Sequence, residues 1–452
     1  MADNAPVSQA EELPSAARLR DIIETVIAEA RALGASDVEA AVSADAGLSV
    51  NVRNDEVETV EHHRDKGLGV TVYFGQRKGN ASTTDFNPAA LSDTVMAACD
   101  IARYISEDPY AGLADADCLA RDIPDLDLYH PWTPSTAEAI ALALECERAA
   151  RGADQRIVNS EGAYISTHAG LRVYGNSRGF LGDYASSRHS LGCTVIARGE
   201  GGMQRDHWYS ISRRATDLES ASSIGQQAAA RTVQRLDGRK LSTRKAPVIF
   251  SAEVARGLLG HLVRAVSGGS LYRRSSFLLD SLGKPLFPEF VEINERPHLP
   301  RALGSAPFDS EGVATRERTL VSGGVLQSYI LDSYAARRLG LQTTGNAGGV
   351  HNLEISAGDM DLAGMLKAVG TGLLVTEVMG QGVNIVTGDY SRGASGFWVE
   401  NGEIQYPVEE ITLAGHLAEM FRGLQAVASD VDRRGNLCSG SWWVEGLTIA
   451  GN

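Results

Sequence analysis

The N-terminal part of the chain alternates between helical and strand-like spacings of apolar side chains. From Ser15 onward, apolar residues recur every three or four positions until Gly34, which predicts an amphipathic helix with Ser15 as its N-cap. Residues 48–52 and 68–74 alternate apolar and polar side chains, as strands with one buried face do. Asn87-Pro88 opens a second helix, because proline is favoured in the first helical turn. Helix, strands and helix together predict a small α+β unit.

The full pattern predicts an α+β protein of three domains, preceded by a disordered N-terminus at residues 1–14. The N-terminal α+β domain covers residues 15–110 and is followed by a polar, proline-containing linker. A middle mixed domain covers residues 125–236. Its first helix begins at Ser135, and a glutamate three residues later predicts a capping box. After a second polar boundary, a β-rich C-terminal domain with hairpins covers residues 246–452.

Hairpins and glycine-rich segments dominate the predicted C-terminal domain. Residues 319–327 and 397–406 each form a pattern of two short strands around a tight turn, and the Asn-Gly of the second favours a type I′ turn. Residues 344–352 and 370–396 are predicted as glycine-rich loops. The longer loop lacks the lysine of a phosphate-binding loop, so its glycines are expected to serve tight turns or close backbone approach. The pair Trp442-Trp443 puts one ring on each face of a strand, in the core or at an interface.

The charge balance argues against nucleic-acid binding. The chain has 452 residues and a formal net charge of −15, whereas proteins that bind phosphate backbones need surplus lysine and arginine. The pairs Arg213-Arg214, Arg273-Arg274 and Arg433-Arg434 are interpreted as solvated surface. The N-terminus resembles no signal peptide, and no apolar run approaches the ~18 residues that span a bilayer. Five scattered cysteines without a CxxC pair complete a pattern that predicts a cytoplasmic protein with neither a membrane nor a nucleic-acid partner.

The helix predicted after Ser251 carries a histidine but no complete metal site. His261 lies close to the buried face of that helix. A catalytic zinc needs further ligands and a carboxylate that activates its water, but the neighbouring positions hold Leu262, Ala265 and Val266. A structural role for His261 is therefore favoured. No serine-hydrolase motif, P-loop or CxxC site occurs elsewhere, so the residues by themselves predict no catalytic centre.

Several longer runs carry a family resemblance. They are GHLVRAVSGGSLYRRSSFLLDSLGK (260–284), PFDSEGV (307–313), TGNAGGVHN (344–352), MGQGVNIVTGDYSRGASGFWVENGEIQYPV (379–408) and the final IAGN. These runs resemble the TldE (PmbA) branch of the TldD/TldE family, formerly labelled modulators of gyrase. The resemblance implies that the chain pairs with a TldD-type paralogue in a hollow heterodimeric metallopeptidase. It also implies that the pair degrades or processes unfolded peptides.

The metal motif of the family is incomplete in this chain. TldD-type chains carry HExxxH, whose two histidines bind the metal with a downstream cysteine and whose glutamate is the base. His261 matches the first histidine, whereas Leu262 and Val266 replace the glutamate and the second histidine. The resemblance thus implies no catalytic residue, metal ligand or cofactor in this chain, and zinc in the TldD-type partner. The candidate vestigial-site or chamber-lining residues are His261, Arg273, Arg274, Asp309, His351 and Cys438, the last of which falls near the metal cysteine with a one-residue offset.

Two functions from other classes stay open. An independent metallopeptidase would gather its ligands from distant segments, such as His261, His351 and Cys438. A non-enzymatic regulator of topoisomerase is the second alternative, and the net charge of −15 argues against it. A homodimer is an expected form of the chain when its partner is absent.

Overall fold

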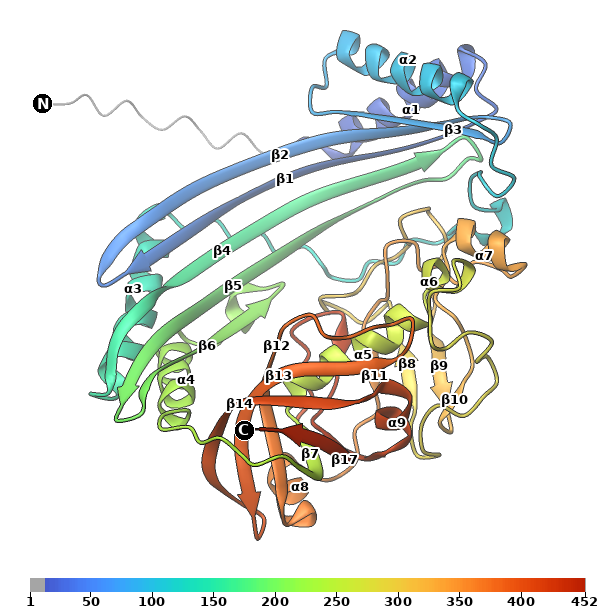
Figure 1. Cartoon of the computed structure of the whole chain (residues 1–452). Helices are drawn as coiled ribbons and strands as arrows, with labels where there is room; N and C mark the ends of the chain where they lie inside the picture. Colours follow the sequence, from blue (N-terminus) through green and yellow to red (C-terminus); the bar gives the residue numbers. More distant parts are fainter. Residues whose placement is uncertain (1–12, 452) are drawn as a thin grey trace, which may run out of the picture.

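Strands from the first two predicted domains form one long antiparallel sheet, which arches over the C-terminal domain (Figure 1). The computed structural model describes residues 13–451, so most of the predicted disordered segment lies outside the described residues. Strand β1 is central, because Val42 pairs with Leu68 on one side and with Val173 on the other. The strands, in the order β3-β2-β1-β4-β5-β6, are β1 (Asp37–Arg53), β2 (Glu56–Phe74), β3 (Arg77–Thr83), β4 (Ile157–Asn176), β5 (Leu181–Gly199) and β6 (Gly202–Ser212).

Helices cover one face of this sheet. They are α1 (Ala16–Ala32), α2 (Pro88–Tyr104), α3 (Thr136–Ala153) and α4 (Ala221–Gln234). Alternate residues of β1 enter two apolar clusters on this face: Val42 packs in the cluster of α1 and α2, and Val50 packs in the cluster of α3 and α4. The predicted caps are confirmed, since Ser15 and Asn87 each accept a backbone N–H of the first turn and Ser135 forms the capping box. Local sequence signals therefore place these helices correctly.

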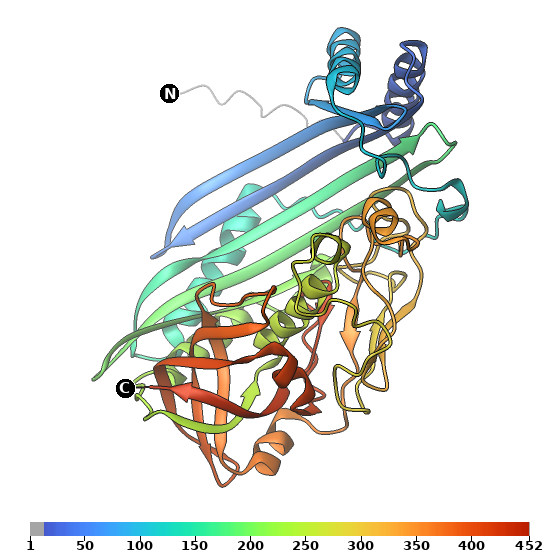
Figure 2. The same cartoon turned by 45° about the vertical axis from the view of Figure 1, so that its right-hand side comes forward.

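The opposite face of the sheet is polar along β1. Ser43, Asp45, Ser49 and Asn51 alternate with the buried residues and are half-buried. One end of this face packs on the C-terminal domain, and both views show the sheet lying above that domain (Figure 2). A strip of polar sheet surface therefore faces the C-terminal domain.

A tight turn at Asn54 and Asp55 joins β1 to β2. Both residues have positive φ, 53° and 66°, as a type I′ turn requires. Glu147 of α3 is fully buried and accepts the backbone N–H groups of Asn54 at 2.8 Å and of Asp55 at 3.0 Å. Strand β3 pairs only with residues 68–74 of β2, so within the described part of the chain residues 56–66 have a strand neighbour on one side only.

The C-terminal domain contains two further sheets, and α5 contacts strands of both. One has the order β14-β13-β12-β7-β17-β15 and the other β10-β9-β8-β11-β16. The strands are β7 (Arg244–Phe250), β8 (Ile293–Glu295), β9 (Arg318–Ser322), β10 (Val325–Leu326), β11 (Leu353–Ile355), β12 (Gly372–Met379), β13 (Asp389–Glu400), β14 (Glu403–His416), β15 (Leu424–Val427), β16 (Leu437–Cys438) and β17 (Trp442–Ala450). The helices are α5 (Ala252–Ala265), α6 (Gly268–Tyr272), α7 (Ser333–Leu339), α8 (Leu362–Val369) and α9 (Leu417–Arg422), and the 3-10 turns of the chain are η1 (Ala116–Cys118) and η2 (Ala215–Asp217).

Both predicted hairpins are present, as β9–β10 and β13–β14. The prediction of a loop throughout 370–396 is wrong, because β12 and the first half of β13 lie within it. The expected close backbone approach is confirmed there: a Cβ on Gly396 would lie 1.9 Å from the carbonyl oxygen of Leu374 on the paired strand. Trp442 is fully buried in the main core, and Trp443 packs on a smaller cluster on the other side.

Residues 123–131, where the proline-containing stretch predicted as linker runs into the predicted middle domain, form an ordered strap between the sheet and the C-terminal domain. Leu128 and His130 exchange hydrogen bonds with Ser187 of β5, and Leu126 accepts the backbone N–H of Arg301 at 2.9 Å. Leu126 and Leu128 are both buried. The strap therefore ties two parts of the fold together.

Among residues 13–451, every helix is too short or too polar to cross a bilayer.

Candidate functional site

Helix α5 presents His261 in a largely apolar environment. The His261 ring is half-buried and packs edge-on against Tyr390, with ring centroids 6.2 Å apart. Burial, reinforced by the positive charge of Arg392, lowers the pKa of His261 to about 4. His261 is therefore neutral at neutral pH. The next position and the one five residues on, Leu262 and Val266, are both 0% exposed in the main core.

The donor chemistry around His261 does not fit a catalytic zinc. Leu262 and Val266 offer neither a ligand nor a base, and their side chains are core residues. The Cys438 thiol is buried, and burial raises its pKa to about 11, so it stays protonated at neutral pH. Throughout residues 13–451, no three His, Cys, Asp or Glu side chains lie in a group that could hold a metal ion. The structure therefore does not assemble His261, His351 and Cys438 into a metal site.

Two of the sequence candidates, Asp309 and His351, line one cavity with a volume of ≈ 410 Å³. It lies between the polar face of the sheet and the C-terminal domain. Asp309 and His351 come from the C-terminal domain, and Arg172 of β4 and Arg188 of β5 come from the sheet. Cys438 does not line this cavity, although the nearby Asn436 does.

Asp309 uses its carboxylate to hold the loop that surrounds it. It is 3% exposed, and its oxygens accept backbone N–H groups from Glu311 at 2.8 Å, Val313 at 2.9 Å and Ala347 at 3.0 Å. Burial raises the pKa of Asp309 to about 6, although these hydrogen bonds and Arg172 favour its charged form. This residue therefore has a structural role at the cavity wall.

His351 is also fixed by its surroundings. Its backbone N–H donates to Glu295 at 2.7 Å, and its Nδ1 donates to the carbonyl oxygen of Gly304 at 3.2 Å. Because Nδ1 carries the proton, Nε2 is an acceptor, and it has no hydrogen-bond partner among the described residues. Burial lowers the pKa of His351, so the ring is neutral.

The sequence analysis did not predict that arginine side chains gather in the wall of this cavity. The interpretation of Arg213-Arg214 as solvated surface is wrong for Arg213, which is 8% exposed. Arg213 donates to the carbonyl oxygens of Ser187 at 3.1 Å and Leu303 at 2.8 Å. Burial, and also the charge of Arg188, lower the pKa of Arg213. No local signal could reveal this, because the contacts join segments far apart in the chain.

The two remaining candidates, Arg273 and Arg274, lie at the end of α6. Both side chains are exposed, and Arg273 stacks on the ring of Tyr272 at 5.1 Å. Arg274 has a positive φ of 55°, which ends the helical segment. Neither lines the cavity that contains Asp309.

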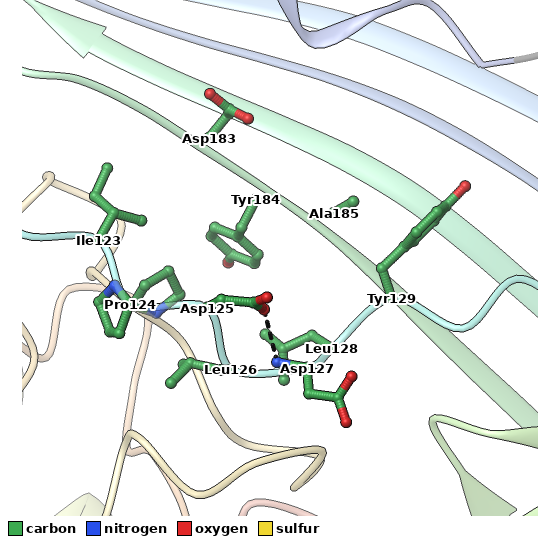
Figure 3. Close-up of a pocket in the computed structure, with 11 residues that line it drawn as sticks. Ile123, Pro124, Asp125, Leu126, Asp127, Leu128, Tyr129, Asp183, Tyr184 and Ala185 are labelled. Carbon is green, nitrogen blue, oxygen red and sulfur yellow. Dashed lines mark hydrogen bonds between the residues drawn. The ribbon is translucent and has the colours of Figure 1, made fainter.

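A second cavity, of ≈ 390 Å³, shares Tyr184 with the first and has Asp125, Asp127 and Asp183 in its wall (Figure 3). The strap residues 123–129 line it together with Asp183 and Tyr184 of β5. Asp125 accepts the backbone N–H of Asp127 at 2.9 Å. Tyr184 lines both cavities, so the aspartates of one wall and the arginines of the other come close to one side chain, although Asp183 and Asp127 are ion-paired with Arg20 and Arg301.

The sequence of each part of the chain matches a known family of proteins. Models of the PmbA/TldA metallopeptidase family match residues 38–102 (domain 1), 129–236 (central domain) and 243–451 (C-terminal domain). The chain therefore belongs to the PmbA/TldD metallopeptidase family.

Two relatives match it over nearly their whole length. The metalloprotease PmbA of Escherichia coli O157:H7 is 54% identical over 96% of this chain and 97% of its own length. A metalloprotease PmbA homolog of Haemophilus influenzae is 51% identical over 96% of each chain.

Solved structures share the fold. A Bacteroides thetaiotaomicron protein described as a modulator of DNA gyrase superposes with a TM-score of 0.91 and 28% identity, over 96% of this chain and 99% of its own. TldE from Thermococcus kodakarensis superposes with a TM-score of 0.81 over 95% of this chain and 100% of its own. Its 19% identity makes it a likeness of fold alone. The α+β class with a β-rich C-terminal domain is thus confirmed.

Proposed function

We propose that this chain is the non-catalytic, TldE/PmbA-type subunit of a heterodimeric metallopeptidase that degrades or processes unfolded peptides. In this proposal the zinc lies in a TldD-type partner. One observation carries it: α5 presents His261 alone, and the two positions that would hold a base and a second ligand are the core residues Leu262 and Val266. Membership of a metallopeptidase family supports the reaction class, and the side chains of α5 support a role without metal.

The part of this chain in that reaction is to hold an extended peptide. Extended peptides bind to sheet edges through backbone hydrogen bonds and to polar surfaces through side chains. The half-buried polar residues of β1, such as Ser43 and Asn51, form a surface of this kind on the sheet face opposite the helices. Residues 56–66 of β2 add a strand edge. Both features support peptide binding without any metal on this chain.

A three-way cleavage assay tests the proposal. An unstructured peptide is incubated with this chain, with the TldD-type chain from the same genome, and with their mixture, each with zinc. Cleavage is expected only in the mixture. His261→Ala in this chain is expected to leave the mixture active, because His261 is neither ligand nor base here. In the partner, replacing the glutamate of HExxxH by glutamine is expected to abolish cleavage.

Two results would refute the proposal. The first is cleavage by this chain alone that a chelator abolishes, together with stoichiometric zinc in the isolated chain. The second is the absence of any complex between this chain and the TldD-type partner in sedimentation or size-exclusion experiments. Circular dichroism of His261→Ala distinguishes a loss of folding from a loss of chemistry.

A further inference from the structure

The cavity between the sheet and the C-terminal domain collects positive charge in a chain whose net charge is −15. Arg172, Arg188 and Arg213 line it from the sheet side, and Arg434 lines it from the C-terminal domain. Arg434 bonds to the carboxylates of Asp432 and Glu253, which balance its charge. Within residues 13–451, the other three arginines form no ion pair with a carboxylate.

Arg213 makes this imbalance unusual. Arginine is rarely buried without a paired anion, because removing an isolated charge from water is costly. Arg213 is 8% exposed, yet its hydrogen-bond acceptors are neutral backbone carbonyls of Ser187, Ala302 and Leu303. Its Nε has no partner among the described atoms. The guanidinium therefore adds a positive field to the cavity that no described carboxylate cancels.

The carboxylates in the cavity wall are too few to balance the positive charge of the arginines. Asp309 is the carboxylate that lines it, and three backbone N–H groups already occupy its oxygens. Arg172 lies close enough to favour the charged form of Asp309. His351, the remaining titratable residue of the wall apart from Tyr184, is neutral. One carboxylate thus faces three unpaired arginines, which leaves the cavity positive.

The position of Arg172 and Arg188 makes them available to a ligand. They lie on neighbouring strands, β4 and β5, where Arg172 pairs with Tyr184 across the two strands. Tyr184 and Arg188 are four residues apart on β5, so both side chains lie on the face that meets the C-terminal domain. Arg188 is exposed and Arg172 is half-buried, whereas Arg213 is buried.

We propose that this cavity binds a carboxylate group of the peptide substrate, held by Arg172 and Arg188. Guanidinium groups bind carboxylates through paired, charge-assisted hydrogen bonds. Apolar residues of the same wall, Tyr184, Ile211 and Phe308, provide a surface for the side chain next to that carboxylate, which favours an organic anion over an inorganic one. A volume of ≈ 410 Å³ lies within the range of ligand pockets, about 300–1,000 Å³, and is enough for the end of a peptide. The identity of the ligand as a peptide rests on the proposed function.

Binding of three matched peptides to the isolated full-length chain tests the inference. The peptides share one unstructured sequence and carry a free C-terminal acid, a C-terminal amide, or a C-terminal amide with a glutamate as the last residue. We expect the amide to bind about tenfold more weakly than the acid, as the loss of a charge-assisted hydrogen bond implies. If the glutamate peptide binds like the acid, the site takes any carboxylate; if it binds like the amide, the site takes the chain end. Both results support the inference.

The arginine variants identify the site. Arg188→Gln is expected to weaken the acid to the level of the amide and to leave amide binding unchanged. Arg205→Gln is the matched control, because Arg205 is an exposed arginine of β6 outside the cavity, and it is expected to change neither. Equal binding of acid and amide by the wild-type chain would overturn the inference. So would an equal loss for both peptides in Arg188→Gln, and so would the same loss of acid preference in Arg205→Gln.

The same peptides separate this inference from the proposed function. If the mixture with the TldD-type partner cleaves acid and amide equally well and the isolated chain shows no preference, the inference fails and the proposed function stands. If the isolated chain prefers the acid but the mixture cleaves neither peptide, the carboxylate site stands and the proposed function fails. Inorganic phosphate serves as a competitor and is expected to displace the acid peptide more efficiently than the amide peptide. Equally efficient displacement of the two peptides by phosphate would also overturn the inference.

Discussion

Restoring the missing glutamate of the HExxxH pattern is expected to destabilise the protein rather than to create a peptidase. Leu262→Glu replaces a leucine that is 0% exposed in the main core. Losing the burial of a leucine side chain costs about 2 kcal/mol. A buried carboxyl whose pKa rises by about 3 units costs about 4 kcal/mol more at pH 8. The sum of about 6 kcal/mol is comparable to the whole stability of many domains, about 5–15 kcal/mol.

The pH dependence of this penalty distinguishes charge from shape. The folded-state pKa of the new carboxyl is raised above its unfolded value, so the folded form is penalised increasingly as pH rises from the unfolded pKa, about 4.3, through the folded pKa. Leu262→Glu is therefore expected to be less destabilised, relative to wild type, at pH 5 than at pH 8. Leu262→Gln loses similar packing and carries no charge, so its penalty is expected to stay constant over the same range.

Denaturant unfolding at pH 5 and pH 8 measures these differences, and zinc content and peptide cleavage are measured on the same samples. The double variant Leu262→Glu, Val266→His is expected to bind no stoichiometric zinc and to cleave no peptide alone. Wild-type stability of Leu262→Glu at pH 8 would refute the estimate of burial. Zinc-dependent cleavage by the double variant would show that α5 retains a competent site and would refute the account of its core.

Three further predictions concern buried residues at which separate parts of the fold contact each other. Phe308→Ala is expected to cost about 3–5 kcal/mol in unfolding experiments, because Phe308 is 2% exposed and joins the C-terminal domain to the sheet through Phe180 and Tyr184; a loss below 1 kcal/mol would contradict this. Asp309 has a folded pKa of about 6, above its ordinary value, so its stability contribution is expected to fall by about 2 kcal/mol between pH 4 and pH 7, and that part of the slope is expected to vanish in Asp309→Asn. Glu147→Gln is expected to cost about 1–3 kcal/mol, because one of two backbone N–H groups at the β1–β2 turn loses its acceptor, and slower amide exchange there than in wild type would contradict it.

The helices and tight turns were predictable because their signals are local. Ser15, Asn87 and Ser135 each cap a helix within four residues of the cap itself. The type I′ turn at Asn401-Gly402 follows from backbone preference alone, and both residues have positive φ. Such elements need no knowledge of the rest of the fold.

The long sheet was only partly predictable. Residues 56–66 of β2 are mostly exposed and carry many charged side chains, so they show no apolar alternation although they belong to a regular strand. The pairing of β1 with β4 joins segments that the sequence pattern assigns to two different domains. Which strands pair depends on both strands, and the sequence between β1 and β4 does not indicate that these two strands pair.

The basic cavity was beyond sequence reasoning for the same reason. Arg172, Arg188 and Arg213 come from three successive strands and their ends, and they meet only because those strands pair. In sequence, Arg213 differs in no way from its neighbour Arg214. By contrast, the replacement of two motif positions by Leu262 and Val266 could be found in the sequence, because the motif lies within helix α5 and its C-cap.

The order of the strands in the long sheet has a consequence for the chain during its synthesis. The β1–β2 hairpin is complete once Phe74 has left the ribosome, but the other edge of β1 waits for β4, which begins at Ile157. At about 5–20 residues per second, the roughly 100 residues from the end of β1 to the start of β4 take about 5–20 s to translate. Throughout that interval the edge of β1 that later pairs with β4 has no partner strand. During this period, mispairing of the nascent N-terminal segment with other chains, or its capture by chaperones, competes most directly with folding.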